Sequence, residues 1–76
     1  MNIVSERSQI LEKHVKDIME FTGWDYPTTW MWVISPKKDL GDYSILELLA
    51  EEDYKYVNDF LNMAKDKGKK YFYRTD

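Results

Sequence analysis

Residues 32–49 decide the fold of this 76-residue chain and read WVISPKKDLGDYSILELL. An aromatic and aliphatic segment stops at a Ser-Pro dipeptide, a short polar link follows, and a helix then begins. Ser44 and Glu47 fit a capping box, in which the hydroxyl accepts a hydrogen bond from a free backbone N–H and the carboxylate reaches back. Leu40 is an apolar anchor, and Gly41 after it can adopt a positive φ. The stretch therefore predicts a packed turn between two elements.

The order and spacing of these residues resemble the toxin-binding domain of the Xre/MbcA/ParS class of antitoxins. In that family a Trp is followed four residues later by a Pro, then by Leu-Gly, a short helix with spaced leucines, and a longer helix closed by Gly. The matching positions are Trp32, Pro36, Leu40, Gly41, Leu46, Leu49 and, further along, Val57, Leu61 and Gly68. The match spans residues 27–68 and departs at two positions. Ile45 stands where the family prefers Pro, and Asp42 where a second Gly is common.

Length and composition predict one small folded domain, residues 1–76. The chain is 43% hydrophobic and contains twelve aromatic residues, which is ample for a core. It has no cysteine, which excludes disulfides and Cys-type zinc sites and fits a reducing cytosol. No apolar run approaches the roughly 20 residues of a spanning helix, and the N-terminus lacks a signal-peptide pattern. We therefore expect a cytoplasmic protein without membrane contact.

Apolar periodicity and capping signals predict an all-α fold, a small bundle of about four helices. The expected helices cover residues 5–22, 27–35, 44–51 and 53–67. Ser5 can cap the first helix, Gly23 ends it, and Gly68 ends the last. One continuous helix over residues 44–67 is an alternative, because no Gly or Pro interrupts it. Residues 28–34 fit a strand and a helix equally well, and the resemblance favours a helix.

The C-terminal tail bunches aromatic side chains beside basic charge. In an extended chain successive side chains alternate sides, so three consecutive aromatic residues cannot all face inward. The tail is therefore expected to be extended, either as an arm for a partner or as a short strand that pairs with the domain. Because Tyr and Arg are favoured interface anchors, the predicted partner-binding residues are Tyr71, Phe72, Tyr73 and Arg74.

Catalytic and ligand-binding motifs are missing from the sequence. His14, the single histidine, lies in the apolar stripe of the first expected helix, which is typical of a packed residue. Phosphate-binding loops, His-x-x-x-His spacing and calcium-loop spacing are absent. We therefore expect no enzyme activity, no metal and no cofactor. Trp24, Trp30 and Trp32 could form a ligand cage, but they are expected to supply core bulk instead.

Charge is unevenly distributed along the chain, whose net charge is −3. Residues 39–59 hold seven acidic side chains against Lys55, and residues 65–74 hold five basic ones against Asp66. The pattern is typical of a solvated helix face followed by a basic last turn. An acidic body argues against nucleic-acid binding by this chain alone, because such binding relies on neutralising phosphates.

The resemblance implies a protein-binding module, the antitoxin of a toxin–antitoxin system. In this family the partner is a RES-type enzyme that consumes NAD, and the antitoxin's C-terminal part blocks the enzyme's cofactor cleft. A homo-oligomer is compatible with the sequence. Two alternatives remain open. One is an unrelated small inhibitor, such as an immunity or phage-encoded protein, which would use the acidic surface of residues 39–59. The other is a DNA-binding transcriptional regulator acting with a partner, although only 26 residues precede Pro27.

Overall fold

The computed structural model describes residues 6–73, which form five α-helices and one 3-10 helix without a β-strand. The elements are α1 (Glu6–Thr22), α2 (Tyr26–Ile34), η1 (Lys38–Leu40), α3 (Ile45–Ala50), α4 (Tyr54–Lys67) and α5 (Lys69–Tyr73). The all-α fold is confirmed, and each of the four expected helices lies within one residue of its expected bounds. Residues 28–34 belong to a helix, as the resemblance favours.

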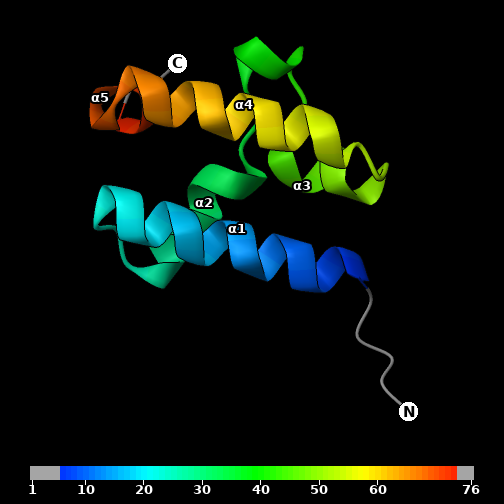
Figure 1. The fold of residues 1–76 in the computed structure, drawn as a ribbon, viewed down its shortest axis with the longest axis horizontal. Coiled ribbons are helices and arrows are strands. Elements are labelled where there is room, and N and C mark those ends of the chain that lie inside the picture. The colour runs from blue at the N-terminus through cyan, green and yellow to red at the C-terminus, as the bar shows by residue number, and fades with distance from the viewer. Residues whose placement is uncertain (1–5, 74–76) are drawn as a thin grey trace.

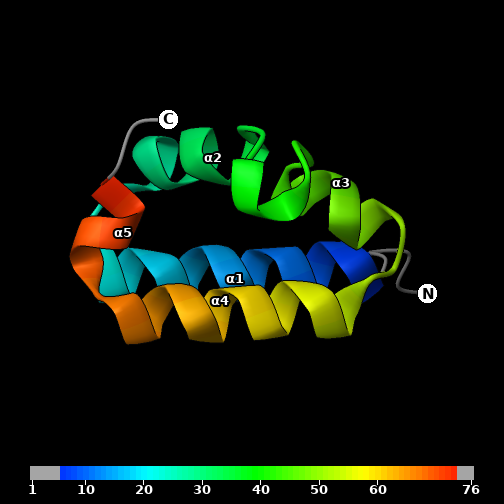
Figure 2. The same cartoon turned by 90° about the horizontal axis from the view of Figure 1, so that it is seen from above.

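The helices form two layers. α1 and α4 lie side by side along the longest axis and run in the same direction (Figure 1). α2, η1 and α3 return in the opposite direction as a second layer, which the view turned by 90° shows (Figure 2). α5 packs against α4 and α1 at the end where both of these helices finish. The chain therefore reverses its direction twice, and its core lies between the two layers.

One hydrophobic core joins the two layers. α1 and α4 are amphipathic and turn their apolar stripes inward, while α3 contributes an aliphatic face. Trp24, Trp30 and Trp32 are half-buried and pack against this core, in agreement with the expected role of core bulk. Among the described residues, the buried apolar side chains are Val15, Ile18, Val33, Leu40, Ile45, Leu48, Leu49, Val57, Phe60, Leu61, Ala64 and Phe72.

The loop between α2 and α3 adopts the packed turn that the sequence predicts. Lys37 and Tyr43 form an isolated antiparallel bridge, in which the Lys37 N–H donates to the Tyr43 carbonyl at 3.0 Å. Leu40 is 2% exposed and anchors η1 in the core. Gly41 follows with a φ of 65°, a left-handed conformation that glycine adopts without a Cβ penalty. The expected roles of both residues are confirmed.

Side-chain caps decide where α2 and α3 begin. The Thr28 N–H donates to the Asp25 side chain at 3.0 Å, and Pro27 occupies the first turn, where its missing N–H costs nothing. In α3 the Glu47 N–H donates to Ser44 Oγ at 3.0 Å, and the Ser44 N–H donates to Glu47 Oε1 at 2.8 Å. The predicted capping box is thus present.

α3 and α4 are separate helices, so the alternative of one continuous helix is wrong. Glu52 between them has a φ of 61°, which no α-helix accommodates. Asp53 precedes α4 as expected, but its side chain makes no capping hydrogen bond. Backbone bonds close the junction instead, since the N–H groups of Glu51 and Asp53 both donate to the Leu48 carbonyl.

The C-terminal tail differs from the expected extended arm or strand. Gly68, with a φ of 97°, ends α4, and the chain then forms the short helix α5. Successive residues of a helix are rotated by about 100°, so three consecutive aromatic side chains point in three directions. Phe72 points into the core and is 1% exposed, while Tyr71 and Tyr73 flank it. The expectation of an extended tail is wrong, because the chain turns at Gly68 and residues 69–73 form a helical turn packed against α4 and α1.

α3 also differs in detail from the pattern of leucines in the resemblance. Leu49 is buried, but Leu46 is 39% exposed. Ile45, which stands where the family prefers Pro, is completely buried. Ile45, which departs from the family pattern, therefore occupies a core position, whereas the matched Leu46 does not.

Two predicted residues, the Ser5 cap and the tail residue Arg74, lie outside the part of the chain that the structure describes. Within that part, every helix is too short or too polar to cross a bilayer.

Candidate functional site

α2 carries an uncharged surface in a chain rich in charge. One third of the residues are Asp, Glu, Lys or Arg, yet none occurs in residues 26–36. Met31 and Ile34, three residues apart and therefore neighbours on the helix surface, are 64% and 48% exposed. A helix that is apolar nearly all round is typically buried. Part of α2 is therefore exposed to solvent, although its apolar composition favours contact with another surface.

A groove of about 470 Å³ runs beside this exposed face. α2, the loop that follows it, and α5 all contribute side chains, so segments far apart in sequence meet there. The lining residues are Trp24, Thr28, Met31, Trp32, Ser35, Pro36, Lys37, Asp39, Tyr71, Phe72 and Tyr73. We call this groove, together with the adjoining Ile34, the α2–α5 surface.

Aromatic rings form the floor of the α2–α5 surface. The rings of Trp32 and Phe72 lie 4.9 Å apart between centroids, and Trp24 lies 6.3 Å from each of them. Trp24 also approaches Tyr73, at 5.6 Å. Such pairs contribute beyond the area that they bury and hold each other in place. The floor is therefore a surface of mutually packed aromatic rings.

Lys37 ties the groove wall to the end of α2. Its ammonium donates to the backbone carbonyls of Trp32 and Ser35, the second at 2.9 Å, and lies 4.2 Å from the Trp32 ring centroid. A cation at a helix C-terminus stabilises the exposed carbonyls and the helix dipole. Contact with the indole face adds a cation–π interaction. Lys37 thus orients Trp32 at the groove.

The structure assigns three of the predicted tail residues to different roles. Tyr71 donates through its hydroxyl to the Asp39 carboxylate, and Tyr73 donates to the Thr22 carbonyl at 2.8 Å. Both rings border the groove, and Tyr73 is 50% exposed. Phe72 touches the groove only from beneath, because it is almost fully buried. Of the three described residues, Tyr73 is the most exposed.

The fold brings the tail residues Tyr71, Phe72 and Tyr73 beside the motif residues Trp32 and Pro36. The sequence predicts these two groups separately. Leu40, Ser44 and Leu49 are buried elsewhere and act in the core or as a cap. Gly41 and Leu46 are exposed but do not line the groove. The motif thus divides into residues of the groove and residues that build the turn beneath it.

Sequence reasoning missed Met31 and Ile34 as surface residues. The helical spacing of Ile34 with Trp30 and Val33 suggests burial, the pattern does not include Met31, and only the structure shows which side of α2 is covered. The absence of charge in residues 26–36 is the signal that could have indicated them, because interface centres are depleted in charged residues and enriched in Met and aromatics.

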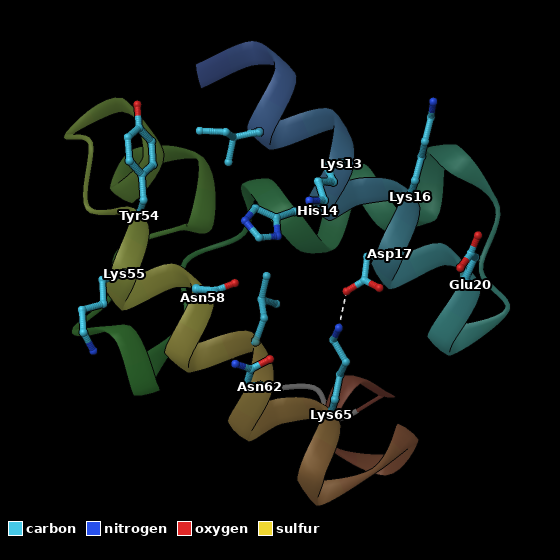
Figure 3. A pocket seen from close by; sticks show the side chains of 12 residues that line it. Lys13, His14, Lys16, Asp17, Glu20, Tyr54, Lys55, Asn58, Asn62 and Lys65 are labelled. Carbon is cyan, nitrogen blue, oxygen red and sulfur yellow. Dashed lines mark hydrogen bonds and ion pairs between the residues drawn. The ribbon is translucent and has the colours of Figure 1, made fainter. Parts of the chain in front are cut away.

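His14 lies away from this surface, in a second groove between α1 and α4 (Figure 3). Burial lowers its pKa from the ordinary value of 6.5, the nearby Asp17 acts to raise it, and Lys65 and Lys13 lower it further. His14 is therefore poorly placed to carry a charge. The described residues contain no group of three potential metal ligands from His, Asp and Glu.

Comparison of the chain with protein-family models, curated proteins and solved structures finds no match.

Proposed function

We propose that this protein is a non-enzymatic protein-binding module that contacts its partner through the α2–α5 surface. The observation that carries the proposal is the uncharged face of α2, where Met31 and Ile34 are exposed beside an aromatic groove. Exposed apolar surface is costly in water, and a grouped patch of this kind favours association. A floor of rings that already pack on one another suits an interface centre, because little further conformational entropy is lost when a partner covers them.

The partner that the sequence resemblance suggests is a RES-type enzyme that consumes NAD. The proposed mechanism is steric: the module covers the approach to the cofactor cleft and needs shape complementarity rather than chemistry. Met31, Trp32 and Tyr73 would form the apolar centre of the contact, with Lys37 and Thr28 at its polar rim. α5 contributes as part of a folded surface and not as a flexible arm.

NAD consumption by a RES-type enzyme from the same genome tests this function. The purified chain should inhibit the enzyme, with full inhibition at a ratio of about one chain per active site, the stoichiometry of tight steric blocking. An NAD-consuming enzyme of a different fold serves as the specificity control and should keep its activity. If the RES-type enzyme consumes NAD equally fast with and without the chain, the proposed partner is wrong.

Two charge substitutions locate the contact. Met31→Glu places a charge on the exposed α2 face and should raise the inhibition constant at least about tenfold, since a desolvated unpaired charge opposes binding. Tyr56→Glu introduces the same charge on α4, where Tyr56 is 44% exposed and does not line the groove. This control should inhibit like the wild type. Equal inhibition by both variants would contradict the assignment of the α2–α5 surface.

A further inference from the structure

In the groove between α1 and α4, three polar side chains form no hydrogen bond within the described part of the chain. It measures about 740 Å³, and the described residues that line it all belong to these two helices, away from the α2–α5 surface. Ile10 and Tyr54, both partly buried, supply its accessible apolar part, and Leu61 lies beneath them at 2% exposure. Figure 3 shows His14 projecting from α1 into the space between the helices and Asn58 projecting toward it from α4. Asn62 lies one turn further along α4.

Polar groups in this groove are available for a ligand. Within residues 6–73, the side chains of His14, Asn58 and Asn62 make no hydrogen bond. Each can offer both a donor and an acceptor, because an amide carries an NH₂ and a carbonyl, and a neutral imidazole has one nitrogen of each kind. A peptide backbone presents the complementary pair of groups at every residue.

The spacing of the two amides fits an extended backbone. Asn58 and Asn62 are four residues apart on α4, which corresponds to a rise of about 6 Å along the helix axis. In an extended peptide, groups on one edge repeat every second residue, at about 6.6 Å. An extended segment along the groove can therefore meet both amides on one side while His14 contacts its other edge.

The charged residues at the rim of the groove indicate which side chains such a segment would carry. Four lysines and two acidic residues line the groove, although the whole chain has a net charge of −3. Lys65 pairs with Asp17, and Lys55 pairs with Asp59. Lys13 and Lys16 on α1 have no ion pair within the described part of the chain. The rim therefore complements acidic side chains.

We propose that the α1–α4 groove binds an extended peptide segment in which acidic and apolar residues alternate. Alternation follows from the geometry of a strand, whose side chains point to opposite faces. The apolar residues would face Ile10 and Tyr54, and the acidic residues would face Lys13 and Lys16. Asn58, Asn62 and His14 would hold the backbone. This site is independent of the α2–α5 surface and needs no RES-type partner.

A titration of the full chain with the peptide Ac-Glu-Leu-Glu-Leu-Glu-NH₂, followed by NMR, tests the proposal. Saturable shifts should appear in the side-chain NH₂ signals of both asparagines and in the His14 ring. The analogue Ac-Lys-Leu-Lys-Leu-Lys-NH₂ should produce no such shifts. Equal binding of both peptides, no binding of either, or the same saturable shifts with inorganic phosphate alone would overturn the proposal.

Matched variants separate the two parts of the site. Lys13→Glu/Lys16→Glu should weaken binding of the acidic peptide about tenfold, whereas Lys69→Glu/Lys70→Glu, with the same change in net charge, should leave it within about twofold. Asn58→Ala/Asn62→Ala should also weaken binding about tenfold, since two hydrogen-bonding groups are lost. Alanine favours helices more than asparagine, so this variant should remain folded. Unchanged affinity in either groove variant would overturn the corresponding contacts.

Discussion

Asp42 adopts a backbone conformation that side chains disfavour. Its φ is 70°, directly after Gly41 with a φ of 65°, so two consecutive left-handed residues turn the chain from η1 toward α3. Glycine relieves this conformation because it has no Cβ, whereas an L-residue pays about 1–2 kcal/mol in the left-handed region. The resembling family commonly has a second glycine here, and the turn geometry provides a physical reason for that preference.

Replacing Asp42 by Gly should therefore stabilise the fold. We expect the free energy of unfolding to rise by about 0.5–1 kcal/mol, because the relieved strain exceeds the entropy that glycine adds to the unfolded chain. Urea denaturation at constant slope measures this change. Asp53→Gly is the matched control, since Asp53 has a φ of −89° and should gain nothing. Equal or lower stability of Asp42→Gly would show that Asp42 is not strained.

His14 should make stability depend on pH below neutrality. Its pKa is lowered in the folded chain, chiefly by burial, so the unfolded chain takes up the proton first as pH falls. The contribution of His14 is therefore complete above its ordinary pKa of 6.5 and is lost as pH decreases from there toward the folded pKa. Asp17, Lys65 and Lys13 are the charged groups that modulate this effect.

Thermal unfolding of the wild type and of His14→Gln measures this contribution. Between about pH 7.5 and about pH 5.5 the wild type should lose more stability than the variant, because glutamine does not titrate. The carboxylates are common to both proteins and cancel in the comparison. Identical pH dependence of the two melting temperatures would show that the folded and unfolded chains bind the His14 proton equally.

At the scale of elements, α5 is a structural part of the bundle. Phe72 packs against Phe21 at 5.4 Å between ring centroids, as well as against Trp24 and Trp32. The Tyr71 hydroxyl donates to the Asp39 carboxylate, which ties α5 to η1. The last helix thus closes the end of both layers.

Truncation after Lys70 should therefore destabilise the domain. It removes the buried Phe72 ring, and the usual cost of losing such a side chain is about 3–5 kcal/mol. A chain that ends after Tyr73 keeps α5 whole and serves as the control, with a melting temperature near that of the full chain. Circular dichroism melting of both truncated chains measures the difference. Equal melting temperatures would show that α5 is not required for the fold.

Local signals predict α1, α3 and α4 correctly, whereas for α2 the resemblance decides between helix and strand. α1 and α4 have apolar stripes, and α3 has its Ser44–Glu47 capping box, so neighbouring residues alone define them. α5 lacks such a signal. Its three consecutive aromatics fit a strand or a helix, and only the pocket formed by Phe21, Trp24 and Trp32 decides which ring is buried. Tertiary packing therefore overrides the local pattern there.

The candidate site was predictable only in part. The sequence points to Trp32 and Pro36 through their place in the motif, and to Tyr73 through its place in the tail, and the fold brings them together. It does not identify Met31, because exposure depends on which side of α2 the second layer leaves uncovered. Residue types can be read along a chain, but the surface that they form depends on how the layers pack.

At the scale of the whole molecule, the two layers present two unlike surfaces. The layer of α2 and α3, with α5 at its end, presents the aromatic groove beside the uncharged face of α2. The layer of α1 and α4 presents the polar groove with His14, Asn58 and Asn62. A chain of this length can thus form two separate contacts, because each helix packs against the core with one face and leaves another face exposed to solvent or a partner.

Oxidation of Met31 in the complex with a RES-type enzyme tests whether the partner covers the α2–α5 surface. Met31 is 64% exposed and should form the sulfoxide readily in the free chain, whereas Met63 on α4 is half-buried and lies outside the groove. Quantification by peptide mass spectrometry should show the rate at Met31 reduced at least about tenfold in the complex, with the rate at Met63 unchanged, as expected for a site excluded from solvent. Oxidation of Met31 at the free rate in a fully formed complex would contradict the proposed contact.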